Sequence, residues 1–111
     1  MIDWARVAEL YEDFGEAMFA EILGAFLQDM EAGQAMLETA QTSEDLRAGF
    51  HFLKGAALNI GMTTIADLCE EGERIASNRA RPDELAAKVQ ARVSHDCQVL
   101  VSEWRMRVGE G

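Results

Sequence analysis

Apolar residues recur along this chain at intervals of three and four, the spacing of amphipathic helices. The first stripe predicts a short helix over residues 3–12, through Trp4, Val7, Ala8 and Tyr11. A break is expected at residues 13–15. A long helix is then expected at about residues 16–41, with one continuous apolar face.

The next helix has clear start and stop signals. Thr42 or Ser43 can cap its first turn, and acidic residues follow directly. Gly61 suits the position just after a helix, so the helix is expected to end near Ile60.

Two further helices complete the expected set. Thr63 or Thr64 can cap the first, and the second begins near Pro82, the only proline, which suits a first helical turn. The apolar residues of this last helix fall at steps of about four: Leu85, Val89, Val93, Cys97, Leu100 and Trp104.

Four long amphipathic helices with short connections predict an all-α fold. We expect an antiparallel up-down-up-down four-helix bundle, with the short N-terminal helix packed across one end. A chain of 111 residues is the size of one domain, so residues 1–111 are expected to form a single helical domain.

Charge is unevenly distributed along the chain. Residues 1–45 contain eleven acidic side chains against the single Arg6, whereas residues 46–111 contain nine acidic and nine basic ones. This acidic surface repels phosphate backbones, so we expect neither nucleic acid nor an anionic membrane as a partner.

The chain also lacks targeting signals. It has no apolar run near the roughly 20 residues of a membrane span, and no secretory signal at Met1, so a cytoplasmic protein is expected. Cys69 and Cys97 fall on apolar stripes, and we expect free, buried thiols rather than a disulfide.

His51 stands apart from the apolar face of its helix. At 100° per residue the apolar side lies opposite the histidine and contains Leu46, Phe50, Leu53, Ala57 and Ile60. The side of His51 contains Arg47, Ala48, Lys54, Gly55, Leu58 and Met62. The histidine is therefore expected to point into solvent.

The neighbours of His51 suit a nucleophile that becomes charged. Lys54 is one turn further on and can offset a negative charge on the ring, while Gly55 leaves space for another protein to approach. An imidazole is a competent nucleophile near neutral pH. The alternative is an ordinary surface histidine, with Gly55 serving close helix packing like Gly24, Gly33, Gly49 and Gly72.

The segment from His51 to Gly61 reads His-Phe-Leu-Lys-Gly-Ala-Ala-Leu-Asn-Ile-Gly. It resembles the signature His-x-Leu-Lys-Gly-[Ser/Ala]-[Ser/Ala]-x-x-[Leu/Ile]-Gly of histidine phosphotransfer (HPt) domains. Cys69 and Glu73 also fall where that family often has a cysteine and an acid or amide. Gly72 departs from the pattern, because a leucine is usual there.

This resemblance implies an HPt protein of a two-component phosphorelay. Because the chain begins at Met1 and ends shortly after its last expected helix, we expect it to be a stand-alone protein. His51 would accept a phosphoryl group from an aspartate of a receiver domain and pass it to another receiver. Lys54 would stabilise the group, Gly55 would open the approach, and Glu73 would orient the imidazole. The partners implied are response-regulator receiver domains and a hybrid sensor histidine kinase. The chain itself is expected to be a monomer.

The remaining expectations concern cofactors and docking. The receiver supplies Mg²⁺, so the chain needs no cofactor or metal of its own, and it contains no ATP-binding loop. We therefore expect a phosphocarrier and not an enzyme. Receiver docking is expected around His51, on the exposed side chains of Arg47, Ala48, Leu58 and Met62.

Two other interpretations remain. The chain could be an interaction module that has the HPt fold without the chemistry. A metal site could also be built from His51, Cys69, His95 and Cys97, although no pair has zinc-type spacing and both cysteines fall on apolar stripes. His95 has no evident partner, so a surface position is expected for it.

Overall fold

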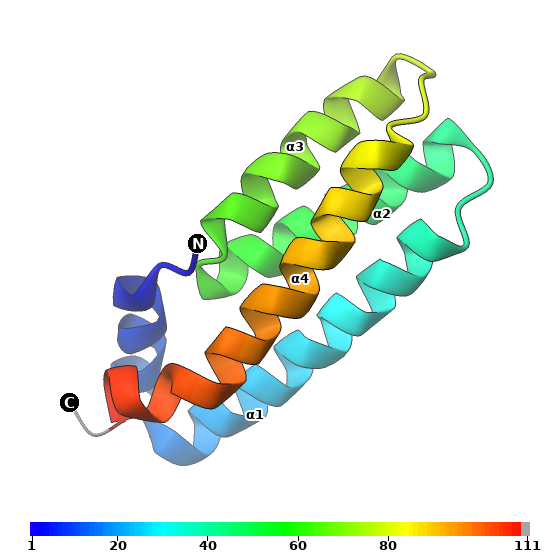
Figure 1. Cartoon of the computed structure of the whole chain (residues 1–111). Helices are drawn as coiled ribbons and strands as arrows, with labels where there is room; N and C mark the ends of the chain where they lie inside the picture. Colours follow the sequence, from blue (N-terminus) through cyan, green and yellow to red (C-terminus); the bar gives the residue numbers. More distant parts are fainter. Residues whose placement is uncertain (110–111) are drawn as a thin grey trace.

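The computed structural model describes residues 1–109, which form four α-helices and one short π-helical turn (Figure 1). The elements are α1 (Trp4–Glu38), α2 (Ser43–Ile60), α3 (Thr63–Ser77), α4 (Asp83–Trp104) and η1 (Arg105–Gly109). Figure 1 shows the four helices side by side along the long axis of the molecule. The expected all-helical fold is confirmed. Outside the helices, the described residues contain one isolated β-bridge, which joins Ile2 to Met62.

Helix α1 contains the break that was predicted at residues 13–15, but the break is smaller. Only Gly15 leaves the helical region, at φ 80° and ψ 168°, a conformation that suits glycine. Figure 1 shows the segment before Gly15 turned away from the axis of the rest of α1. The segment expected as a separate helix over residues 3–12 is thus the first part of α1, and the second part ends at Glu38 rather than near residue 41.

The ends of α2 are built as expected. The Thr42 hydroxyl accepts a hydrogen bond from the backbone N–H of Asp45, and the Asp45 carboxylate accepts one from the N–H of Thr42, which together form a capping box. Gly61 ends the helix in the left-handed conformation, at φ 87°. Helix α3 then starts after only one more residue, Met62, which occupies its N-cap position.

The starts of α3 and α4 differ slightly from expectation. Thr63 and Thr64 lie inside α3 and do not cap it. Pro82 precedes the first residue of α4 rather than lying in its first turn.

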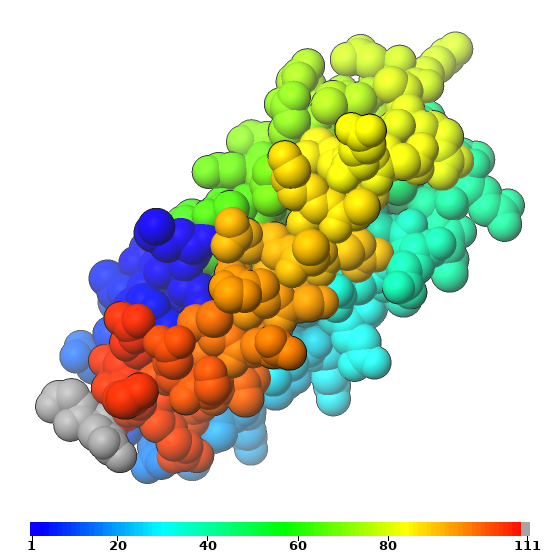
Figure 2. All heavy atoms as spheres, in the orientation of Figure 1, coloured from blue at the N-terminus to red at the C-terminus, as the bar shows by residue number. Residues whose placement is uncertain are grey.

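The helices pack around one elongated core, and the Cα atoms span 46 × 20 × 20 Å (Figure 2). The largest fully buried side chains include Phe19 of α1, Phe50 of α2 and Ile65 of α3. Near the bend of α1, the rings of Phe19 and Trp104 lie 4.9 Å apart between centroids. This contact connects α1 to the end of α4.

The buried face of α4 differs from the predicted one. Ala86 and Asp96 are buried, whereas Leu85 and Cys97 are only half-buried. A step of four residues advances about 40° beyond a full helical turn, so a stripe of fours drifts away from the core. Asp96 is a buried carboxylate that the apolar pattern did not indicate; its Oδ1 lies 3.6 Å from Nη1 of Arg92.

Candidate functional site

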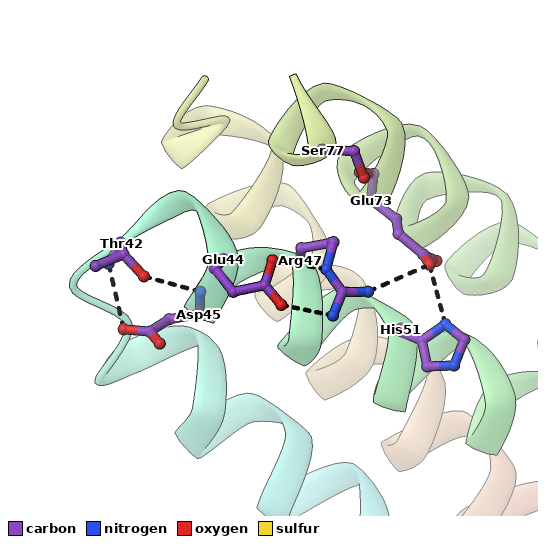
Figure 3. Close-up of polar contacts among 7 residues, drawn as sticks. All are labelled: Thr42, Glu44, Asp45, Arg47, His51, Glu73 and Ser77. Carbon is purple, nitrogen blue, oxygen red and sulfur yellow. Dashed lines mark hydrogen bonds and ion pairs between the residues drawn. The ribbon is translucent and has the colours of Figure 1, made fainter. Parts of the chain in front are cut away.

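His51 projects from the middle of α2 into solvent, with 65 % of its side chain exposed. Its Nδ1 lies 3.0 Å from Oε1 of Glu73, which comes from α3 (Figure 3). The other ring nitrogen, Nε2, lies on the side away from Glu73. The structure thus brings together two residues that the sequence separates by 22 positions and leaves one ring nitrogen open to a partner.

Beside the contact between His51 and Glu73, α2 and α3 approach each other closely one residue earlier on each helix. A Cβ at Gly72 would lie 2.7 Å from three ring atoms of Phe50, so only glycine fits beneath this ring. Phe50 precedes His51, and Gly72 precedes Glu73. The absence of a side chain at Gly72 therefore makes room for Phe50 beside the site.

Glu73 is the shared partner of three basic side chains. Its Oε1 accepts from His51 and lies 4.0 Å from Nη1 of Arg47, and its Oε2 lies 2.9 Å from Nζ of Lys54. Partial burial acts to raise the pKa of the Glu73 carboxyl, but the nearby ammonium of Lys54 and the hydrogen bond with His51 outweigh it and hold the pKa below its usual value. Glu73 is therefore a carboxylate at neutral pH.

Lys54 and Arg47 are both engaged on this face. The close ion pair with Glu73 is the main reason that the pKa of Lys54 lies above its ordinary value. Arg47 is bound through two nitrogens to Glu44, at 2.9 Å and 2.7 Å, and the pKa of Arg47 is raised mainly by that hydrogen bonding (Figure 3). Both cations therefore stay charged beside the imidazole.

The surface around His51 is open on one side. A Cβ placed on Gly55 would meet nothing within 4 Å, in contrast to Gly33, Gly49 and Gly72, which lie against neighbouring side chains. Leu58 is 57 % exposed, as predicted, whereas Ala48, which was also expected to be exposed, is half-buried.

Met62 does not belong to this surface, and its predicted exposure was wrong. Its side chain is fully buried. The helical wheel assumed that α2 continues to Met62, but Gly61 ends the helix and turns the chain into α3. Met62 then pairs with Ile2 in the isolated bridge and packs inward.

Within the described part of the chain, the other candidate ligands do not form a metal site with His51. Cys69 is buried, and burial raises the pKa of its thiol to about 12; Cys97 is half-buried, and burial raises its pKa to about 11. His95 is exposed on α4, as expected. Within residues 1–109, no group of three His, Cys, Asp or Glu side chains is arranged to hold a metal ion.

Sequence reasoning missed one part of this site. Arg47 was expected only as a contact for a docked receiver, yet it approaches Glu73 and binds Glu44. The i, i+3 spacing of Glu44 and Arg47 was a signal for their pairing. The approach of Arg47 to Glu73 depends on how α2 and α3 pack, which no spacing within one helix reveals.

The helices of the described region also bear on membrane insertion. None of them combines the length and the apolar character that a membrane span requires.

Comparison with known proteins bears directly on this geometry. The family model described as "Hpt domain" matches residues 17–103, which include α2, α3 and all the side chains around His51. No curated protein and no solved structure was found to match the chain. Hpt domains carry out histidine phosphotransfer in phosphorelays, where they partner with receiver domains and kinases. Since the match covers most of the chain, this protein belongs to the family of Hpt domains.

Proposed function

We propose that this chain is a phosphocarrier in which His51 accepts a phosphoryl group from a receiver-domain aspartate and passes it to a second receiver. The observation that carries the proposal is the pairing of an exposed imidazole with Glu73 through Nδ1, which leaves Nε2 free. The partners are response-regulator receiver domains and a hybrid sensor histidine kinase. The donor aspartyl phosphate supplies the reactive group, so the chain acts as a carrier without ATP chemistry of its own.

Glu73 determines which ring nitrogen reacts. A carboxylate only accepts hydrogen bonds, so Nδ1 donates its proton to Oε1, and the lone pair of the neutral ring resides on Nε2. Nε2 attacks phosphorus, the bond from phosphorus to the aspartyl oxygen breaks, and the aspartate leaves as a carboxylate. The ring gains a positive charge in this step, which Glu73 offsets.

Lys54 is placed to act on the group after transfer. A phosphoryl group adds close to two negative charges, which attract an ammonium one helical turn away. Lys54 is one quarter exposed and adjoins the ring, so its flexible side chain can move from Glu73 to the phosphoryl oxygens. The Mg²⁺ of the reaction belongs to the receiver, and the chain is proposed to need neither metal nor cofactor itself.

The receiver docks on the open side of His51. Gly55 has no neighbour above it, and Ala48 and Leu58 offer apolar contacts. Beyond them, Ala56 and Asn59 line a hollow of about 380 Å³ between α1 and α2. We also propose that this chain works as a cytoplasmic monomer, built as an antiparallel up-down-up-down bundle in which the part of α1 before Gly15 serves as the additional N-terminal helix.

A transfer assay tests the proposal. The chain is incubated with a receiver that carries radiolabelled aspartyl phosphate, and acid-labile label on the chain is measured. Label is expected on the wild type and on the control variant His95→Gln, and not on His51→Gln. Transfer to His51→Gln at the wild-type rate would disprove the assignment. A chain that binds receivers but takes no label would be an interaction module with the Hpt fold.

A further inference from the structure

Glu73 has fewer oxygens than basic neighbours. Nζ of Lys54 lies 2.9 Å from Oε2, and Nδ1 of His51 lies 3.0 Å from Oε1. Nη1 of Arg47 lies 4.0 Å from the same Oε1, which is beyond hydrogen-bonding distance. The side chain of Glu73 is only 20 % exposed, so its carboxylate depends on these basic side chains as well as on water for its stabilisation.

Arg47 is held so that one nitrogen remains for Glu73. Its Nε and Nη2 bind the two oxygens of Glu44, at 2.9 Å and 2.7 Å. This edge of the planar guanidinium is therefore fixed, and Nη1 is the nitrogen directed toward Glu73 (Figure 3). A lysine at this position could not make both contacts at once, because its ammonium is a single point of charge.

If His51 is phosphorylated, as the proposed function requires, the phosphoryl group and the Glu73 carboxylate compete for the ammonium of Lys54. The ammonium that moves to a phosphoryl group on Nε2 leaves Oε2 of Glu73 without its ion pair. A carboxylate that is poorly exposed to water and has lost its cation raises the free energy of the folded state. A second cation within reach lowers this cost, and the described residues place Arg47 there.

We propose that Arg47 is a positioning residue that closes onto Glu73 when Lys54 turns to the phosphoryl group. Arg47 thereby frees Lys54 to stabilise phosphohistidine, and Glu44 keeps Arg47 in reach. Arg47 itself contacts neither the ring nor the phosphoryl group in this arrangement.

The test uses phosphoramidate, a small donor that needs no receiver. Nε2 attacks its phosphorus, the phosphorus–nitrogen bond of the donor breaks, and ammonia leaves. The rate of labelling of His51 is measured for wild type and Arg47→Gln. The matched control is Arg74→Gln, because Arg74 forms the same i, i+3 pair with Glu71, and among the described residues its side chain makes no ion pair with the carboxylate of Glu73.

Arg47→Gln is expected to slow labelling up to about fivefold, the effect of one partly exposed ion pair, and Arg74→Gln to leave the rate unchanged. The decisive measurement is a double-mutant cycle. In a Lys54→Gln background Lys54 cannot be freed, so Arg47→Gln should have almost no further effect. An equal effect of Arg47→Gln in both backgrounds would show direct electrostatic attraction of the donor and overturn the proposal.

A measurement on the wild type avoids dependence on variants. On phosphorylation, the side-chain ¹⁵N resonances of Lys54 and Arg47 are expected to shift together, while those of Arg74 stay in place. An unmoved Arg47 resonance would overturn the proposal. Failure of the wild type to take label on His51 would instead contradict the proposed function, and the role of Arg47 with it.

Discussion

The ring of Phe50 lies directly over Gly72, in the space that a side chain on Gly72 would occupy. Phe50 directly precedes His51, and Gly72 directly precedes Glu73. The packing of α2 on α3 at this point is therefore adjacent to the residues of the exposed site.

The first prediction concerns this packing. Gly72→Ala should destabilise the fold by about 1–3 kcal/mol, because the added methyl group overpacks the contact with Phe50. Urea unfolding measures this change. Gly24→Ala is the matched control, since nothing lies within 4 Å of a Cβ there and alanine favours the helix by up to about 1 kcal/mol. Equal stability of the two variants would show that α2 and α3 are not in close contact at Gly72.

The second prediction separates access from chemistry at Gly55. A Cβ at Gly55 meets nothing within 4 Å and the position is exposed, so the fold should tolerate a leucine there. Transfer from a phosphorylated receiver should fall at least about tenfold, since the side chain stands in the docking surface and a loss of about 1.4 kcal/mol in docking suffices. Labelling by phosphoramidate should change little. A receiver that transfers equally fast to Gly55→Leu would remove this residue from the approach path.

The third prediction concerns Lys54. Lys54→Ala should slow transfer by about tenfold or more through the loss of a charge-assisted contact with the phosphoryl group. Thermal unfolding should remain cooperative, because the side chain of Lys54 is not part of the hydrophobic core. Lys88→Ala removes the other lysine of the chain, on the exposed face of α4, and should leave transfer unaltered. Equal transfer rates in the two variants would exclude Lys54 from the mechanism.

The fourth prediction compares two apolar residues that the sequence placed on one surface. Met62→Ala should cost about 2–5 kcal/mol of stability, since Met62 is fully buried. Leu58→Ala should change stability by less than about 0.5 kcal/mol and weaken receiver binding, since Leu58 is 57 % exposed. Urea unfolding and titration with a receiver measure the two effects. A Met62→Ala protein of normal stability would contradict the buried position.

The fifth prediction is a dependence on pH. The pKa of Glu73 is lower in the folded chain than its ordinary 4.5, so the folded state releases this proton more readily than the unfolded chain does. The stabilisation is therefore complete above about pH 5 and is lost as the pH falls through 4.5 and below. The free energy of unfolding of wild type minus that of Glu73→Gln should accordingly decrease toward pH 3. A difference that grows on acidification would mean that the pKa is raised instead.

Periodicity within a helix predicted the parts of the site that lie on α2. His51, Lys54 and Gly55 share a face because of their spacing, and the exposed His51 confirms that placement. The prediction for Met62 was wrong because it continued this periodicity past Gly61, where the chain turns. A wheel is valid only as far as the helix that it represents.

Contacts between helices were less accessible from the sequence. The position of Glu73 followed from a family pattern, since no spacing along one helix relates it to His51. Burial of Asp96 went against the chemistry of a carboxylate, and a core stripe of apolar residues could not reveal it. Such features depend on the relative position of helices, which side-chain pattern alone does not determine.

The short connection between α2 and α3 sets the register of the whole site. His51 lies nine residues before the end of α2 at Ile60, and Glu73 lies ten residues after the start of α3 at Thr63. At 1.5 Å per residue, both therefore stand roughly 14–15 Å from the turn, at the same height on adjacent helices. One residue inserted within α3 before Glu73 would rotate its carboxylate by about 100° around the helix axis and break the pairing. The number of residues between the turn and each of these side chains therefore fixes the distance between His51 and Glu73.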